Sequence, residues 1–366
     1  MTSRERLTRL FNGQEIDRTP IWLLAPFHPF GTYADIYNIP CYESVVALID
    51  KYCDTFNRRS YPFGFCRNAN HEIKLENFQE TVGENVREGV KVTYKDFTLK
   101  QWVSRGLEGT EVKFFLDDIN DLERILEIPY IAGKPDTSSY LREKNELGDK
   151  GIMMTDIGDP LGPLHGLMNP SDFSMATITD YDKLLTFTDE MYSRYLQNYK
   201  YLLERDIGEV FFIVGTEFAG PPLVAPSKFN ELCTKYVKGI VDLIRDYGKK
   251  SIVHYHGNLY QILDGMKAIN PDGLHTIEAP PIGDCTLTQA REALGDMILI
   301  GNIQYDDLTR KEPIEIDTLV KEAIHQAKGG RFILSPTAGP YEESISKKMQ
   351  NNYVAFVEAG LKYGMM

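Results

Sequence analysis

The sequence predicts an α/β protein built on a parallel sheet, and its fold class is that of a (β/α)8 TIM-type barrel. Beyond about residue 150, short apolar runs typical of strands alternate with amphipathic stretches typical of helices, such as 227–247. Polar side chains then follow most of the apolar runs, as they do at the mouth of such a barrel. The apolar runs are 151–154, 210–214, 251–253, 273–277, 297–300 and 331–334.

The first part of the chain predicts an N-terminal helical and β-hairpin elaboration of this scaffold. Residues 3–14 have the apolar spacing of an amphipathic helix, and a strand-like run follows at 21–24. Apolar and polar residues alternate over 90–94 and again over 97–100, on either side of a short turn, which predicts an antiparallel hairpin. We expect this hairpin to be an insertion on the larger scaffold.

Composition excludes several classes of function. The 366 residues are 42% hydrophobic and 25% charged, which is typical of a globular protein, and no apolar stretch approaches the ~20 residues that span a bilayer. The N-terminus carries both charge signs and leads into no apolar run, so we expect a cytoplasmic protein. A net charge of -13 without a long basic run argues against nucleic-acid binding but leaves a small acidic ligand open. Five scattered cysteines without a CxxC pair argue against a disulfide framework and a zinc ribbon.

Two histidines separated by one residue, His254 and His256, end one of the apolar runs. Side chains alternate along a strand, so imidazoles at i and i+2 project from the same face and can converge on one ion or one substrate anion. Such pairs also occur as ordinary polar residues at strand ends. The pair alone therefore does not decide whether these histidines bind a ligand or are ordinary polar residues at a strand end.

Other apolar runs end in side chains of the same kind. Asp156 follows the first run, Glu217 the second, Glu278 the fourth and Asn302 the fifth. Strand ends are polar partly because they leave the core, but a barrel would also gather these side chains at one mouth. Two glutamates flanking a doubled histidine are residue types that a metal site needs.

Several sequence blocks together resemble the uroporphyrinogen decarboxylase-like superfamily. The blocks are 1–6 through 12–13, 17–20, 215–220, 254–258, 300–303 and 329–336, an ordered series that covers nearly the whole chain. The resemblance implies one TIM-type barrel domain over 1–366, with the elaboration within about 25–150.

Two branches of that superfamily differ in chemistry. True uroporphyrinogen decarboxylases resemble one another in an arginine-rich loop after the first strand, where this chain has Ala25-Pro26-Phe27-His28-Pro29-Phe30. A substrate with many carboxylates needs several Arg or Lys donors, so a lyase (decarboxylase) acting on a carboxylated substrate is the alternative. In the corrinoid-dependent methyltransferases a His-x-Cys motif and a later Cys bind zinc. Their His matches His254, the first Cys falls on His256, and the late Cys falls on Ala338.

The resemblance therefore implies a methyltransferase with a changed metal site. A His/Glu set gives a more Lewis-acidic ion than thiolates do, suited to an oxygen or nitrogen function. The hypothesis is a zinc-dependent enzyme that demethylates a small methoxylated or methylated compound and passes the methyl group to the corrinoid (cobalamin) of a partner protein. The expected metal ligands are Glu217, His254, His256 and Glu278, and the expected catalytic residues are Asp156, Glu217 and Asn302.

Some points stay open at the level of sequence. Cys285 is either a further ligand or a small buried residue, and the aromatic residues Phe27, Phe30, Tyr33 and Tyr37 either line a substrate pocket or cover the barrel opening. A homodimer is also left open. A binding protein without turnover remains a third class, because a fold does not dictate a function.

Overall fold

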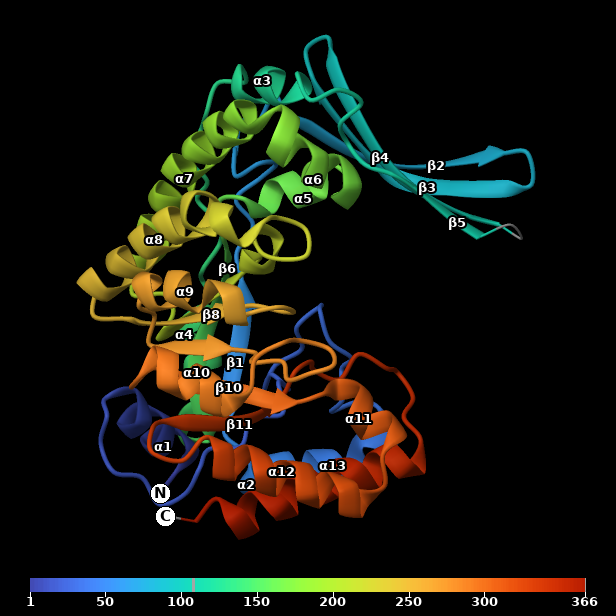
Figure 1. Ribbon diagram of the computed structural model, residues 1–366. Helices are drawn as coiled ribbons and strands as arrows, with labels where there is room; N and C mark the ends of the chain where they lie inside the picture. Colours follow the sequence, from blue (N-terminus) through green and yellow to red (C-terminus); the bar gives the residue numbers. More distant parts are fainter. Residues whose placement is uncertain (107–108, 366) are drawn as a thin grey trace.

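A curled parallel sheet of seven strands lies at the centre of the computed structural model, which describes residues 1–106 and 109–365 (Figure 1). Every neighbouring pair of strands is parallel, which confirms the expected βαβ arrangement. In spatial order the strands are β1 (Thr55–Ser60), β6 (Gly151–Gly158), β7 (Val210–Val214), β8 (Lys250–His254), β9 (Gly273–His275), β10 (Ile298–Ile303) and β11 (Phe332–Pro336).

A short extended segment, 20–22, lies between the two edges of this sheet. The amide of Trp22 donates to the carbonyl of Leu334 in β11 at 2.9 Å, and the amide of Leu334 donates to the carbonyl of Pro20 at 2.9 Å. On the other side, the amide of Asp54, which precedes β1, donates to the carbonyl of Ile21 at 2.7 Å. The strand expected at 21–24 is thus an isolated parallel bridge. The described chain has seven barrel-type strands, and the full eight-stranded barrel stays a prediction.

The inward-facing side chains of the curled sheet form one apolar cluster. Helix α1 (Ser3–Phe11) covers the N-terminal ends of the strands and places Leu7, Leu10 and Phe11 in the same cluster. The helix expected over 3–14 is confirmed, although it ends at Phe11. Alternate residues of the strands supply the rest because side chains on a strand change face with period two. They are Trp22, Leu24, Phe56, Ile152, Met154, Val210, Phe212, Ile252, Ile298, Ile300 and Ile333.

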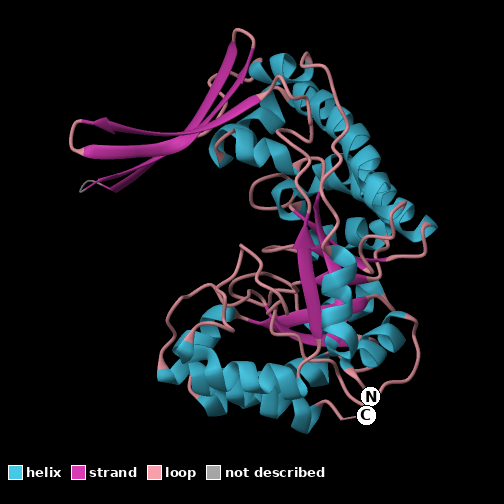
Figure 2. Ribbon diagram, turned by 180° about the vertical axis from the view of Figure 1, so that it is seen from behind, coloured by secondary structure: helices cyan, strands magenta, loops and turns pink. Residues whose placement is uncertain are grey.

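The larger helices surround the outer face of the sheet, as the view from behind shows (Figure 2). The helix expected over 227–247 begins with a 3-10 turn, Pro226–Lys228, and a π turn, Asn230–Thr234, before its α-helical part. In the described ranges no helix combines the length and apolar character needed to cross a membrane. The helices after α1 are α2 (Glu43–Tyr52), α3 (Asp121–Leu126), α4 (Tyr140–Leu147), α5 (Gly162–Leu167), α6 (Pro170–Thr179), α7 (Tyr181–Leu203), α8 (Lys235–Asp246), α9 (Leu263–Ile269), α10 (Leu287–Leu294), α11 (Tyr305–Arg310), α12 (Pro313–Gln326) and α13 (Lys347–Tyr363).

A second, antiparallel sheet extends from the body as an arm (Figures 1 and 2). Tyr94 pairs with Phe97 across its central turn, which confirms the predicted hairpin. At the root of the arm, alternate residues of this hairpin, such as Val92 and Leu99, are buried against the core. The sheet also has two outer strands that the sequence did not predict. Its order is β2 (Lys74–Val82), β3 (Asn85–Tyr94), β4 (Phe97–Gly106) and β5 (Gly109–Lys113).

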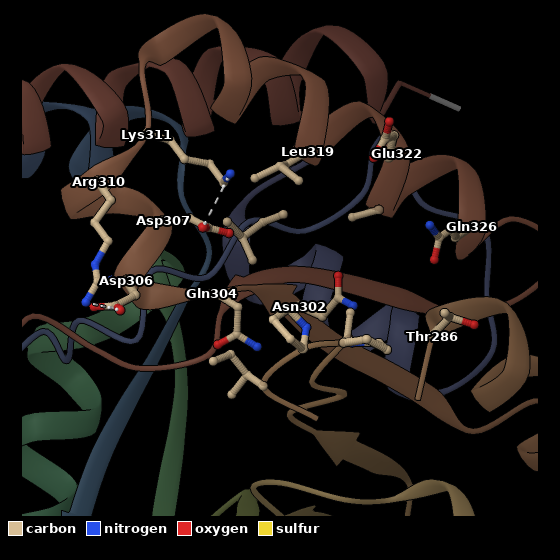
Figure 3. A pocket seen from close by; sticks show the side chains of 16 residues that line it. Thr286, Asn302, Gln304, Asp306, Asp307, Arg310, Lys311, Leu319, Glu322 and Gln326 are labelled. Atoms are coloured by element: carbon tan, nitrogen blue, oxygen red, sulfur yellow. Dashed lines mark ion pairs between the residues drawn. The ribbon is translucent and has the colours of Figure 1, made fainter. Parts of the chain in front are cut away.

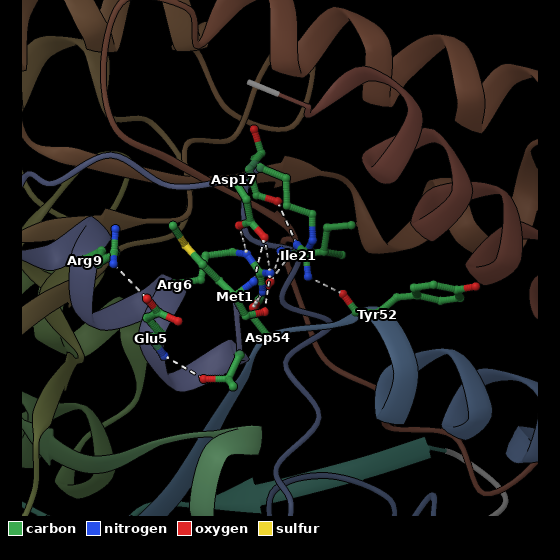
Figure 4. Close-up of polar contacts among 11 residues, drawn as sticks. Met1, Glu5, Arg6, Arg9, Asp17, Ile21, Tyr52 and Asp54 are labelled. Carbon is green, nitrogen blue, oxygen red and sulfur yellow. Dashed lines mark hydrogen bonds and ion pairs between the residues drawn. The ribbon is translucent and has the colours of Figure 1, made fainter.

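A buried carboxylate fixes the segment between the sheet edges (Figure 4). Asp54, 1% exposed, accepts hydrogen bonds from Arg6 Nη1 at 2.6 Å, Arg18 Nη1 at 2.8 Å and the amide of Ile21 at 2.9 Å. Asp17 accepts a second set of bonds from Arg6, with Nε at 2.6 Å. Since hydrogen bonds to charged groups are the strong ones, this network anchors the chain at the N-terminal end of the sheet. The 17–20 block therefore serves the fold.

Candidate functional site

The structure brings the histidine pair and the two predicted glutamates to the carboxyl ends of β7, β8 and β9. His254 is the last residue of β8, and the ring of His256 lies 4.5 Å from it, centroid to centroid. Glu217 is in a 3-10 turn, Thr216–Ala219, that follows β7, and Glu278 follows β9. The predicted convergence of these strand ends is present.

His256 is held by Glu278. Its Nδ1 donates to Oε1 of Glu278 at 3.2 Å, while Oε2 of Glu278 accepts from the amide of Gly257 at 2.7 Å. Burial lowers the pKa of His256, but the hydrogen bond to Glu278 and the charges of Glu278 and Glu217 outweigh burial, and the pKa is raised. With Nδ1 engaged, the other ring nitrogen, Nε2, is the one left for a ligand.

His254 is held by a third histidine, His275, that the sequence analysis missed. Their Nδ1 atoms are 2.8 Å apart, and their rings stack at 5.0 Å. Burial, with the neighbouring cations, lowers the pKa of both well below the usual value, so both are neutral near pH 7. Nε2 of His275 donates to the carbonyl of Pro336 at 3.5 Å, which leaves its Nδ1 to accept from His254. Nε2 of His254 therefore carries a lone pair.

Glu217 and Asp159 form a pair of poorly solvated carboxyl groups beside the histidines. One oxygen of each, Oε2 and Oδ2, is buried and has no hydrogen-bond partner within the described chain. Burial and the charge of Glu217 raise the pKa of Asp159 to about 7, and burial also raises the pKa of Glu217. Since two carboxylates in one apolar region disfavour each other's charge, this pair keeps a proton near neutral pH.

Asp156, predicted to be catalytic, is held in an ion pair with Arg58 of β1. Nε of Arg58 donates to Oδ1 of Asp156 at 2.9 Å, and a second bond joins Nη2 to Oδ2. The guanidinium also lies 4.7 Å from the ring centroid of Phe212 and donates to the hydroxyl of Tyr33. Arg58 escaped the sequence analysis because β1 is not an apolar run.

Asn302 lines a separate cavity of about 480 Å³, bounded by β10, the loop after Glu278, α11 and α12 (Figure 3). Gln304 lies beside it in the cavity wall and accepts a hydrogen bond from the hydroxyl of Thr337 at 3.2 Å. Asp307 and Lys311 form an ion pair in its wall at 3.9 Å. Asn302 thus lines a cavity whose described lining does not include the histidine pair, and its catalytic role stays a prediction.

A second cavity, of about 540 Å³, opens at the ends of β6 and β7 and includes Glu217 in its wall. This volume suits a small organic molecule. Its apolar lining includes Phe65, Phe115, Leu167, Val214 and Phe218, and its polar lining is Arg67, Gln101, Tyr195 and Glu217.

The predicted metal ligands do not form a ready-made metal site. Within 1–106 and 109–365, no three His, Cys, Asp or Glu side chains are grouped as they would be around an ion. The donor chemistry nevertheless suits one, because His254 and His256 are each fixed through Nδ1 and Glu217 has an unsatisfied oxygen. Cys285 is a buried thiol whose pKa burial raises to about 12. The zinc assignment stays a prediction.

These features define an α/β protein with a curled parallel sheet and a candidate site at the carboxyl ends of its strands. A sequence model of the uroporphyrinogen decarboxylase family matches residues 181–359. This match agrees with the resemblance to the uroporphyrinogen decarboxylase-like superfamily that the sequence blocks indicate. No curated protein sequence matches it.

Two solved structures are similar to this chain to different extents. A methyltransferase from Methanosarcina mazei aligns over 99% of both chains with a TM-score of 0.60 and 17% identity. A B12-independent methionine synthase from a Shewanella species aligns over 63% of this chain and 69% of its own, with a TM-score of 0.43 and 10% identity. The first alignment shows that the fold extends over the whole chain, including the arm.

Proposed function

We propose that this protein is a metal-dependent methyltransferase that takes a methyl group from a small methoxylated or methylated compound. A corrinoid cofactor on a partner protein is the proposed acceptor. The observation that carries the proposal is the anchoring of His254 and His256 through Nδ1, by His275 and Glu278 respectively. Metal-binding histidines commonly have such partners, which fix the ring and leave Nε2 to face the ion.

In this proposal the ion is held by Nε2 of His254, Nε2 of His256 and the unpartnered oxygen of Glu217. Glu278 then orients His256 and is not itself a ligand, which revises the ligand set expected from sequence. Because these groups are not gathered as they stand, side-chain movement accompanies metal binding. When bound, zinc would supply Lewis acidity that stabilises negative charge on the leaving oxygen.

The protein's own residues have two further tasks. Glu217 lies both beside the histidines and in the wall of the 540 Å³ cavity, so a molecule in that cavity lies next to the proposed ligands. Burial and the charge of Glu217 raise the pKa of Asp159 to about 7, so Asp159 can hold a proton near neutral pH, and the demethylated oxygen needs a proton when the product leaves. The corrinoid acceptor rests on the sequence resemblance, and the methyltransferase of the same fold supports methyl transfer as the reaction.

The test is metal content, measured by elemental analysis on the purified protein and on a His254→Ala/His256→Ala variant. We expect about one zinc per chain, lost in the double variant, because neutral His and carboxylate groups supply the binding energy. His325→Ala, an exposed histidine in α12, is the matched control and should keep its metal. Full metal content in the double variant, or no metal after reconstitution, would contradict the assignment. Methoxylated compounds are then screened with cob(I)alamin for formation of methylcobalamin.

A decarboxylase acting on a carboxylated substrate is the second candidate, and two arginines favour it. Arg58 and Arg67 both lie at the carboxyl ends of the strands, so this region has cations that the residues after the first strand-like run lack. Release of CO2 that survives prolonged chelation would favour this reading over metal-dependent methyl transfer.

A further inference from the structure

Arg67, which is half-buried, differs in its partners from the buried arginines of this protein. Arg6 and Arg18 pair with Asp54, Arg58 pairs with Asp156, and Arg194 pairs with Glu190. Within the described chain, no ion pair joins Arg67 to a carboxylate, and its guanidinium instead lies over the ring of Tyr195 at 4.7 Å. A cation removed from bulk water without a counter-charge is costly, so its place in a cavity wall needs an explanation.

The backbone holds Arg67 in this position. Cys66 and Arg67 both have left-handed conformations, with φ of 46° and 59°, which non-glycine residues rarely adopt. Two side chains of α7 tie down their carbonyls: Arg194 donates to Cys66 at 3.3 Å, and Asn198 donates to Arg67 at 3.4 Å. Strained residues that the surrounding structure holds in place often mark ligand sites.

The rest of the cavity is suited to an apolar, planar molecule. Its aromatic side chains, Phe65, Phe115 and Phe218, come from three separate segments of the chain. Among the described residues of the lining, Arg67 is the one cationic side chain and Glu217 is the one anionic side chain. Arg67 can therefore pair with the negative charge of a ligand, while Glu217 lies between the cavity and the histidine pair.

We propose that this cavity binds a small aromatic carboxylate, with its acid group paired to Arg67 and its ring against the phenylalanines. A guanidinium matches a carboxylate with two parallel hydrogen bonds, and aromatic walls suit a planar ring. The inference rests on the proposed function for its chemistry, because it names methoxylated aromatic acids as the class of methyl donor. The binding step itself involves neither metal nor corrinoid.

The test compares ligands that differ only in charge. Isothermal titration calorimetry measures binding of benzoate, 3-methoxybenzoate and the neutral benzamide to the protein as isolated. The two acids should bind at least about tenfold more tightly than the amide, since a hydrogen bond to a charged group has roughly twice the strength of a neutral one. Equal binding of benzoate and benzamide would overturn the inference.

Arg67→Gln should weaken benzoate binding by about tenfold or more and leave benzamide binding unchanged. Arg124→Gln is the matched control, because Arg124 also lies over an aromatic ring, that of Phe97 at 4.1 Å, and is remote from the cavity lining. If Arg67→Gln does not fold, Arg67→Lys keeps the charge but loses the two-bond geometry, and it should bind benzoate with intermediate affinity. Unchanged benzoate affinity in the folded variant would overturn the inference.

The benzoate titration can succeed or fail independently of the tests of the proposed function. Loss of zinc binding or of methyl transfer leaves the benzoate titration interpretable. Conversely, efficient methyl transfer from neutral methoxylated compounds, with no preference for acids, would support the proposed function and reject this assignment.

Discussion

Replacing Asp54 by asparagine tests whether the buried ionic network holds the sheet edges together. The substitution keeps the shape of the side chain and removes its charge. Asp54 is 1% exposed and accepts bonds from Arg6, Arg18 and the amide of Ile21. Arg6 keeps Asp17, but Arg18 is left with the backbone carbonyls of Thr19 and Tyr52.

The expected loss follows from that unpaired cation. Removing one partner of a buried ion pair costs about 3–5 kcal/mol, a large share of the roughly 5–15 kcal/mol that stabilises a typical protein. Asp17→Asn is the matched control. Its side chain is 38% exposed and Arg6 retains Asp54, so its loss should stay within about 1 kcal/mol.

Urea unfolding, followed by circular dichroism, measures both losses as shifts in the transition midpoint. The reasoning is refuted if Asp54→Asn and Asp17→Asn shift the midpoint equally. If Asp54→Asn does not accumulate as folded protein, Arg18→Met, which leaves Asp54 paired with Arg6, should be the milder change.

Two further predictions concern the sheet and its mouth. The pKa of Asp159, about 7, lies above that of an unfolded aspartate, so the folded state holds the proton more tightly, and the free energy of unfolding should fall as the pH rises from about 4 to about 7. Asp159→Asn removes this dependence, so its advantage over the natural protein in urea midpoint should be greater at about pH 8 than at about pH 5; an equal advantage would contradict the assignment. Gly151→Ala would place a Cβ 2.0 Å from the carbonyl of Thr55 in β1 and should cost about 1–3 kcal/mol. Gly166→Ala is the control, because a Cβ at that position meets nothing within 4 Å. Equal urea midpoints for the two variants would contradict the expected clash between Gly151→Ala and β1.

The strands that the sequence predicted well are those buried on both faces. β7 and β11 are continuous apolar runs because helices cover one side and the inner cluster covers the other. β1 was missed because it places Asn57, Arg58 and Arg59 at positions that face other polar groups. β2 was missed because it is exposed along nearly its whole length and has no buried face to impose a pattern.

The sequence predicted that several of these side chains lie at the ends of neighbouring strands, but it predicted only part of their contacts with one another. Adjacency in sequence identified His254 and His256, and the strand ends identified Glu217 and Glu278. His275 was hidden inside a run interpreted as a strand, and only the stacking across β8 and β9 reveals its contact with His254. Arg67 carries no sequence signal, because its role depends on a left-handed turn and on what is absent around it.

The position of α1 bears on the side from which ligands can reach the candidate site. The N-terminal end of the sheet is covered by the apolar side chains of Leu7, Leu10 and Phe11. These side chains belong to the same buried apolar cluster as the inward-facing residues of the strands. Within the described chain, these side chains fill the N-terminal end of the sheet interior. Under the proposed function, a small substrate and a corrinoid-carrying partner would both approach Glu217 from the carboxyl ends of the strands. The substrate would then have to bind before the partner docks.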